Sequence, residues 1–247
     1  MGQRTRTSWS TRRLPGRLPP WRSQLATHLP GPRRVLVRNM ANPRKPGGGV
    51  KSGAGAQEED LFRRSDLHRF LAARPSLYPL SEGTGLLSRG VTVFRGVESE
   101  GFPAIQPFQI DVLTFAAPAH PRVADGQYLY RHDALKMREV VRQLLGLADQ
   151  SGCQVVLFSA FGCGAFGHPP IQVAQFFRGL LSRPWCSPAR VWFCIIDDHN
   201  AHVRRNPDGN FGPFSRALAP DPWRSPLPGI EVAPFGAFTL WSFRSRF

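Results

Sequence analysis

The sequence has few acidic residues, and none of them lies among its first 57 positions. The same stretch holds 12 of the 32 lysines and arginines, which leaves 20 basic against 17 acidic residues, or about +3, for positions 58–247. An arginine-rich, acid-free segment suits a polyanion such as RNA, DNA or another phosphate-bearing polymer. A solvated, disordered tail is the alternative that this composition also favours.

Long apolar runs and paired cysteines are also missing. No segment approaches the ~20 apolar residues that a membrane-spanning helix needs. The four cysteines form no CxxC pair and have no zinc spacing, which is typical of reduced, buried thiols in an intracellular protein. The beginning lacks the apolar core of a secretory signal; it is as rich in Arg and Ser/Thr as a transit peptide, but its prolines oppose an amphipathic helix. We therefore expect a cytoplasmic protein, with organelle targeting as the minor alternative.

Short apolar runs alternate with helical stripes along the middle of the chain. Strands are predicted at 35–37, 90–96, 110–118, 154–161 and 189–197, and helices at 57–73, about 137–148, about 170–181 and, as a short closing element, 210–218. This alternation predicts an α/β domain in layers around a largely parallel or mixed sheet. The predicted organisation is a basic arm at 1–32, one folded domain at 33–218 and a proline- and aromatic-rich tail at 219–247.

Two glycine-rich loops, 47–56 and 162–167, each follow an apolar strand and enter a helix. The carboxyl ends of parallel strands share one edge of a sheet, where ligands of such folds bind. A glycine loop before a helix offers open backbone N–H groups and the positive end of the helix dipole, which together favour phosphate. The pair of loops therefore predicts a phosphate or diphosphate site, although a glycine run alone also indicates simple flexibility.

Glu58 and Glu59 are the first acidic residues of the chain and fall in the first turn of the predicted helix. Acids at a helix start are commonly caps that the dipole stabilises. Beside a bound sugar phosphate, however, one carboxyl group can protonate a glycosidic oxygen and then activate water. Neighbouring helical side chains point about 100° apart, so the two acids cannot flank one bond from opposite faces. One of them would serve as both acid and base, while the other binds the sugar.

The stretch "PGGGVKSGAGAQEEDLFRRSDL" resembles the sequence signature of microbial-type poly(ADP-ribose) glycohydrolases, a triple glycine followed by Gln-Glu-Glu. The residues "NMAN" at 39–42 are similar to the Asn-x-Ala-Asn strand end of macrodomains, and "FSAFGCGAFGHPPIQVAQFF" to the second loop of the family. The similarity runs from about Arg33 to Leu218. It implies a three-layer α/β/α macrodomain with a mixed central sheet. Phe161 stands where the family usually has tryptophan.

The resemblance also implies a role for each matching residue. Glu59 would be the catalytic acid and base, and Glu58 would bind ribose hydroxyls. Asn39 or Asn42 would hold the distal ribose, with Asn39 the better-aligned position, and Gln57 would help to position the ligand. Phe166 would pack against the distal ribose. The backbones near the diphosphate would be those of Gly47, Gly48, Gly49, Gly162, Gly164, Ala165 and Gly167.

Two other chemistries have weaker support in the sequence. Cys163 lies near His168, as in a cysteine nucleophile with its base, but no residue that would orient the base is identifiable. The run Asp197-Asp198-His199 contains metal-ligand types but fits a polar strand end better. The glycohydrolase mechanism that the resemblance implies needs neither a metal nor a cofactor.

The sequence thus predicts a monomeric hydrolase that cleaves ribose–ribose O-glycosidic bonds of poly(ADP-ribose) and releases ADP-ribose. The alternatives are a hydrolase that removes a single ADP-ribose from protein or nucleic acid, a non-catalytic ADP-ribose-binding macrodomain, and a nucleic-acid binder that uses the basic arm. The polymer or an ADP-ribosylated protein is the expected partner, with a weak polyanion contact through the arm.

Overall fold

The computed structural model describes residues 34–182, 190–197, 201, 208–218 and 229–234. Its centre is a six-stranded sheet in the order β2-β3-β1-β6-β7-β8. The strands are β1 (Val35–Met40), β2 (Gly85–Arg95), β3 (Ala104–Phe115), β6 (Val155–Phe158), β7 (Arg190–Ile195) and β8 (Ile230–Pro234). Of the described strands in this sheet, only β2 runs antiparallel to its neighbour, so the predicted mixed sheet is confirmed.

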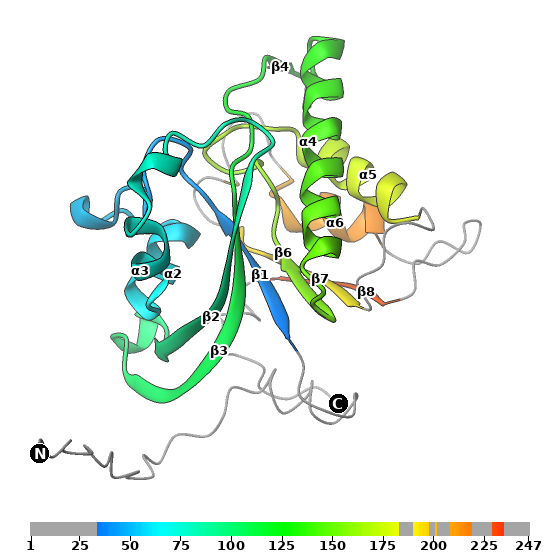
Figure 1. Cartoon of the computed structure of the whole chain (residues 1–247). Coiled ribbons are helices and arrows are strands. Elements are labelled where there is room, and N and C mark those ends of the chain that lie inside the picture. Colours follow the sequence, from blue (N-terminus) through cyan, green and yellow to red (C-terminus); the bar gives the residue numbers. More distant parts are fainter. Residues whose placement is uncertain (1–33, 183–189, 198–200, 202–207, 219–228, 235–247) are drawn as a thin grey trace, which may run out of the picture.

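Helices cover both faces of this sheet (Figure 1). One face is covered by α4 (Arg131–Gln150), α5 (Pro170–Leu181) and α6 (Phe211–Leu218), and the other by α2 (Gln57–Arg64) and α3 (Leu67–Ala72). Three single 3-10 turns, η1 (Val50–Ser52), η2 (Pro75–Leu77) and η3 (Glu98–Glu100), and a small hairpin of β4 (Val123–Ala124) and β5 (Gln127–Tyr128) complete the described elements. The three-layer α/β/α prediction is confirmed. No helix within the described ranges is both long and apolar enough to cross a membrane.

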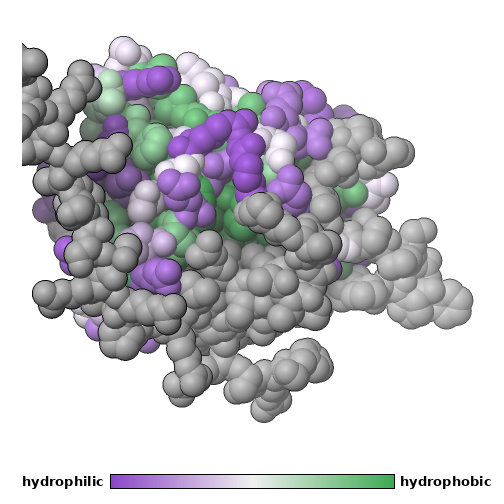
Figure 2. Space-filling model, turned by 60° about the horizontal axis from the view of Figure 1, so that its bottom comes forward, coloured by the Kyte–Doolittle hydropathy of each residue, from purple (hydrophilic) through white to green (hydrophobic). Residues whose placement is uncertain are grey.

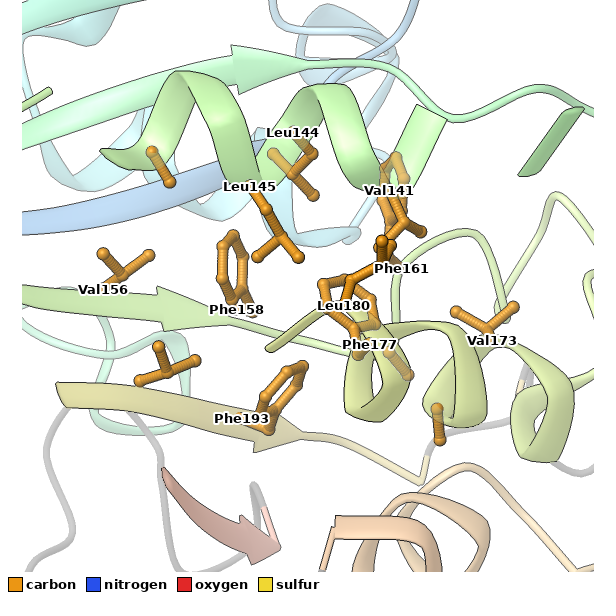
Figure 3. Close-up of a cluster of buried hydrophobic side chains, with 14 of the residues drawn as sticks. Val141, Leu144, Leu145, Val156, Phe158, Phe161, Val173, Phe177, Leu180 and Phe193 are labelled. Carbon is orange, nitrogen blue, oxygen red and sulfur yellow. The ribbon is translucent and has the colours of Figure 1, made fainter. Parts of the chain in front are cut away.

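The larger core lies under α4 and α5, where the stripe predicted from Met137 to Ala148 faces the sheet. Figure 3 shows side chains of these helices meeting phenylalanines of β6 and β7. Phe177 of α5 lies with its ring centroid 5.0 Å from that of Phe193 and 5.5 Å from that of Phe158. Tilted and edge-to-face pairs of this kind add about 0.5–1.5 kcal/mol each beyond the burial of apolar area. This packing fixes β6 and the glycine loop that follows it.

The single helix predicted over 57–73 is wrong, because the chain breaks at Ser65 and forms α2 and α3. The Ser65 hydroxyl donates to the carbonyl of Leu61, and the Ser65 backbone forms a bridge with Val93 of β2. Asp66 then exchanges two hydrogen bonds with Thr92, at 3.1 and 2.7 Å. Pairing with the sheet thus outweighs continuation of the helix, and it ties α2 to the sheet.

The sheet extends into the segment predicted as the tail, because β8 pairs in parallel with β7. The two strands β2 and β3 are also longer than the runs predicted at 90–96 and 110–118. Residues 1–32, predicted as a basic arm, lie outside the described residues.

The two ends of the sheet differ in character. At the end where β1 begins, Asp111 of β3 binds the side chains of Arg34 and Arg89, the backbone N–H of Gly90 and the thiol of Cys153. Figure 2 turns this end of the molecule toward the viewer, where hydrophilic side chains lie among apolar ones. At the other end, β1 and β6 are adjacent and parallel, so both glycine loops leave the same edge, as predicted.

Candidate active site

Asn39 and Glu58 meet where β1 ends against the start of α2. Both side chains are buried, and the Asn39 amide donates to the Glu58 carboxylate at 3.1 Å and to the Thr114 hydroxyl at 3.3 Å. The backbone N–H of Gly47 donates to the same Glu58 oxygen at 3.2 Å, and that of Asn42 to the other oxygen at 2.7 Å. The side-chain carbonyl oxygen of Asn39 is buried and has no hydrogen-bond partner among the described residues. It is therefore a free acceptor beside Glu58.

Glu59 lies against the first glycine loop. Its Oε1 accepts a hydrogen bond from the backbone N–H of Gly49 at 2.7 Å, while its Oε2 is buried and finds no partner in the described part of the chain. A buried polar atom without a partner is rare and costs about 1–3 kcal/mol, so it calls for an explanation such as a ligand or water. The carboxylate is thus held by one oxygen and has the other available for chemistry.

Two further predicted residues bind the protein itself. Gln57 accepts from the Met40 N–H at 2.7 Å and donates to the Arg38 carbonyl at 2.8 Å, which joins the first residue of α2 to β1. The Asn42 side chain accepts from the backbone N–H of Arg44 at 2.8 Å and so shapes the loop. Of the two candidate asparagines, Asn39 therefore has its side chain at the acidic pair, and Asn42 contributes its backbone.

The glycines of the first loop are needed for close approach. Gly48 has a left-handed backbone (φ +49°), and a β-carbon there would lie 2.3 Å from Oε1 of Glu59. At Gly47 (φ +73°) a β-carbon would lie 2.5 Å from the ring of Phe62. The N–H groups of Gly47 and Gly49, predicted to face a diphosphate, instead hold the two glutamates. The first loop thus fixes the acids in place.

The second loop offers the open N–H groups. Gly164, Ala165 and Phe166 donate no backbone hydrogen bond within the described part of the chain, and Ala165 is exposed. Gly167 donates to the Gly164 carbonyl at 2.9 Å and has φ +76°, and Gly162 has φ +75°. Consecutive free N–H groups in a tight turn form a concave site for an anion. The structure thus brings the predicted loop to the right edge with its donors unused.

His168 holds this second loop in place, and the cysteine alternative loses its base. The His168 ring bonds the Tyr128 hydroxyl at 2.7 Å and the Pro118 carbonyl at 2.8 Å. Burial lowers the pKa of His168, which favours the neutral ring. Cys163 donates its thiol to the Phe161 carbonyl, and burial raises its pKa. The positioning role of His168 was not predicted, because Tyr128 and Pro118 are 40 and 50 residues away.

The metal alternative at 197–199 also has a structural explanation in its first residue. Asp197 accepts hydrogen bonds from the N–H groups of Asn210 and Phe211 at 2.6 and 3.1 Å, at the start of α6. Asp198 and His199 lie outside the described residues. No group of three or more metal-ligating side chains occurs within the ranges that the structure describes.

Two residues near the acids were not predicted from the sequence. Arg38 is buried on the α4 side of β1, with its guanidinium 4.0 Å from the centroid of the Phe161 ring and a bond to the Phe115 carbonyl. Burial lowers its pKa to about 9. The Tyr78 hydroxyl is buried without a hydrogen-bond partner in the described ranges, and burial and the charge of Glu58 raise its pKa. For Arg38, the sequence offered one indication of such a role, namely a single arginine within an apolar strand.

Burial is also the main influence on Glu58. It raises the pKa of Glu58 to about 7, against the lowering effect of the N–H donors of Asn42, Asn39 and Gly47, and the neighbouring Glu59 raises it further. A carboxyl group that titrates near neutral pH is typical of functional sites. The pair therefore combines a hydrogen-bonded, strongly buried acid with a second acid that has one free oxygen.

Comparisons with known proteins agree with the fold. The sequence profile described as "Microbial-type PARG, catalytic domain", where PARG is poly(ADP-ribose) glycohydrolase, matches residues 22–96. No curated protein matches the chain. Among solved structures, a mutant of the poly(ADP-ribose) glycohydrolase from Thermomonospora curvata is 30% identical, with a TM-score of 0.65 over 79% of this chain and 74% of that one.

Two more solved structures contain ligands. The Thermomonospora curvata enzyme bound to the inhibitor ADP-HPD is 31% identical, with a TM-score of 0.64 over 79% of this chain and 73% of that one. The enzyme from Deinococcus radiodurans in complex with ADP-ribose is 27% identical, with a TM-score of 0.61 over 81% of this chain and 79% of that one. This chain therefore belongs to the family of microbial-type poly(ADP-ribose) glycohydrolases.

Proposed function

We propose that this protein hydrolyses ribose–ribose O-glycosidic bonds of poly(ADP-ribose) and releases ADP-ribose. Its family and fold support this activity. Within the chain, the observation that carries the proposal is Oε2 of Glu59, which is buried beside the glycine loop and has no partner among the described residues. A carboxyl oxygen so placed is free to exchange a proton with substrate.

In the proposed reaction, protonated Glu59 donates its proton to the departing ribose oxygen as the glycosidic bond breaks. The sugar passes through an oxocarbenium-like state, and the carboxylate then takes a proton from the water that attacks the same carbon. Bond cleavage and water addition thus balance, and Glu59 returns to its starting form. This reaction needs only one acid. That requirement agrees with the side chains of Glu58 and Glu59, which point in different directions because they are adjacent in a helix.

The other site residues bind and orient the substrate. Glu58 and Asn39 hold ribose hydroxyls, for which Asn39 has a free carbonyl oxygen and Tyr78 a free hydroxyl within the described part of the chain. The N–H groups of Gly164, Ala165 and Phe166 bind the diphosphate, with Gly162 and Gly167 providing the turn. Phe166 packs on the distal ribose. The acids are positioned by Gly47, Gly48 and Gly49, which also leave room for the diphosphate of the ligand. The ends of the first glycine loop are fixed by Gln57 and Asn42.

Glu59→Gln tests the proposal, since glutamine keeps an oxygen for the Gly49 N–H but cannot transfer a proton. Removal of a general acid and base costs about 10²–10⁴-fold in rate. We expect turnover of poly(ADP-ribose) to fall by this factor while ADP-ribose binding, measured by calorimetry, stays within about twofold. Glu100→Gln, an exposed acid in η3, is the matched control and should keep full activity.

Other outcomes identify the alternatives. Binding without turnover by the wild-type protein would make it an ADP-ribose-binding macrodomain. Release of single ADP-ribose groups from modified protein, with no action on the polymer, would make it a mono-ADP-ribosyl hydrolase. The proposed role of Glu59 fails if Glu59→Gln and wild type turn over equally.

We further propose that residues 1–32 contact the anionic polymer through their arginines, that the protein acts as a monomer and that it works in the cytoplasm. The acid-free composition of the arm supports the first point. Light scattering of the purified chain tests the second, and imaging of the tagged protein in cells tests the third. A dimer or an organelle signal, respectively, would contradict them.

A further inference from the structure

A small surface next to the second glycine loop has no role in the reaction above. It consists of the β4–β5 hairpin and the first turn of α4, which lie together beyond the edge of the sheet (Figure 1). The His120 N–H donates to the Phe166 carbonyl at 3.0 Å, and the Tyr128 hydroxyl bonds His168 at 2.7 Å. The hairpin is therefore fastened directly to the loop that we assign to the diphosphate.

Three flat side chains stack on this surface, and we call Arg122, Tyr130 and His132 the stack. The Arg122 guanidinium carbon lies 5.7 Å from the centroid of the Tyr130 ring, and its Nη1 donates to the Tyr130 hydroxyl at 3.3 Å. The centroids of the Tyr130 and His132 rings are 5.5 Å apart, with an interplanar angle of 15°. Tyr130 is 40% exposed and the His132 side chain 74% exposed. The Tyr130 and His132 rings are thus held nearly parallel at the surface, and the exposed His132 ring leaves an outer face for another planar group.

The hairpin itself is rigid enough to present the stack. Asp125 and Gly126 both have positive φ (+49° and +70°), the pair of angles that a two-residue turn needs. The Leu129 N–H donates to the Arg122 carbonyl at 2.8 Å, and the Arg122 N–H donates to the carboxylate of Asp133 in α4. These bonds hold the Arg122 backbone, and the Asp133 N–H, which donates to the Tyr130 carbonyl at 3.2 Å, holds that of Tyr130.

The charge of this surface suits an anion. Residues 120–138 contain four Lys and Arg and two Asp, a net charge of +2, besides two histidines. Glu82, which pairs with Lys136 at 2.7 Å, lowers this charge to +1. One of the two acids, Asp133, is engaged by the Arg122 N–H and by His132. Arg122 and Arg131 are both exposed. Planar rings interleaved with cations are the means by which proteins bind the bases and phosphates of a single-stranded nucleotide polymer.

We propose that the stack is a second nucleotide subsite, which binds the adenine and a phosphate of the ADP-ribose unit adjacent to the one held in the active site. This inference rests on the proposed function and names the part of the polymer that the hairpin recognises. The adenine stacks on the exposed face of His132, whose ring packs against Tyr130, and Arg122 pairs with the phosphate. The subsite adds affinity for polymer over free ADP-ribose without touching the bond that is cleaved.

Binding measurements in the full chain test the subsite separately from turnover. ADP-ribose and a two-unit ADP-ribose oligomer are titrated by calorimetry against Glu59→Gln and against the same chain with Tyr130→Ala and His132→Ala added. We expect the oligomer to bind the first protein more tightly than ADP-ribose does. In the second protein its affinity should fall about tenfold or more, the effect of losing one base stack, with ADP-ribose affinity kept within about twofold.

Matched variants make the outcome decisive. Tyr130→Phe with His132→Tyr keeps two stacking rings and should keep the affinity of the oligomer, whereas Leu135→Ala removes a side chain that is as exposed and should change nothing. An oligomer affinity that the double alanine variant leaves unchanged overturns the proposal, as does an equal loss for both ligands. Failure of the wild-type chain to release ADP-ribose from the oligomer would count against the proposed function, and it would leave the binding comparison intact.

Discussion

At the residue scale, burial and hydrogen bonding act on Glu58 in opposite directions. Three N–H donors favour its ionised form, yet burial raises its pKa to about 7, above the usual value of 4.5. An acid whose pKa is higher in the folded than in the unfolded chain stabilises the fold below the lower value. That contribution is lost as the pH rises through the higher value. Ionisation of this buried acid therefore costs folding free energy.

Glu58→Gln checks this cost, because an amide does not titrate. The unfolding free energy of wild type minus that of the variant should fall by about 3 kcal/mol between about pH 4 and pH 8, since each pKa unit corresponds to ~1.4 kcal/mol. Urea titrations across this range measure the difference. A difference that stays constant would show that Glu58 ionises with an ordinary pKa in the folded protein.

The site residues that could be predicted are those that lie close together in the sequence as a recognisable motif. Glu58, Glu59 and the glycines of the first loop share one short segment, so the sequence alone indicates their chemistry. Arg38, Tyr78 and His168 have roles that depend on partners brought in from other elements. The assignment of N–H groups was also beyond the sequence, because only geometry shows that Gly47 and Gly49 donate to the acids.

At the element scale, the Gln57 side chain positions α2. It accepts a hydrogen bond from the Met40 N–H of β1 and donates one to the Arg38 carbonyl of the same strand. Gln57→Glu keeps the shape but places a carboxylate oxygen 2.8 Å from the Arg38 carbonyl. We expect a decrease of about 1–3 kcal/mol in unfolding free energy at neutral pH, the cost of an unmatched buried polar group. Because α2 carries both acids, kcat should fall with it.

Protonation offers the control for Gln57→Glu. At acidic pH the new carboxyl group can donate to the Arg38 carbonyl again, so the stability difference from wild type should shrink as the pH falls. Thermal unfolding followed by circular dichroism at several pH values measures this. A difference independent of pH would attribute the decrease to something other than this hydrogen bond.

Local pattern predicted most of the elements, and pairing explains the failures. The structure confirms the predicted strands β1, β6 and β7 and the predicted helix α4. Burial on one or both faces requires apolar residues at these positions, so the sequence pattern is clear. The break at Ser65 was missed because the helical pattern continues across it and only Val93 and Thr92 interrupt it. The full lengths of β2 and β3 were missed because the added residues mix apolar and polar side chains without a continuous apolar run, and only their pairing with each other makes them strand.

At the scale of the whole molecule, positive charge is concentrated in the first part of the chain. Of the net charge of +15, residues 1–32 contribute +6 without any acid, residues 33–57 another +6 and residues 58–247 only about +3. A polyanion that contacts the arm would release counterions, so its binding weakens as salt rises. The arm therefore predicts a salt-dependent KM for polymer with a salt-independent rate at saturation.

Arg12→Gln with Arg13→Gln, in the full chain, tests the arm. The slope of log KM for poly(ADP-ribose) against log salt should become shallower by about 0.7 for each phosphate that the variant no longer neutralises. The control is Arg69→Gln with Arg74→Gln, which removes the same charge from two exposed positions, one in α3 and one just after it. This variant should leave the slope unchanged. Equal slopes in all three proteins would show that the arm does not touch the substrate.

The strand order has a consequence for the chain during synthesis. β1 is central, but it pairs with β3 and β6, which are made later, and β8 lies at the far edge of the sheet. A nascent chain that has reached α4 already contains both glutamates and the first glycine loop, yet it lacks the strand that leads into the second loop. We therefore expect the growing polypeptide to acquire poly(ADP-ribose) hydrolysis only after β6 and the second loop have left the ribosome.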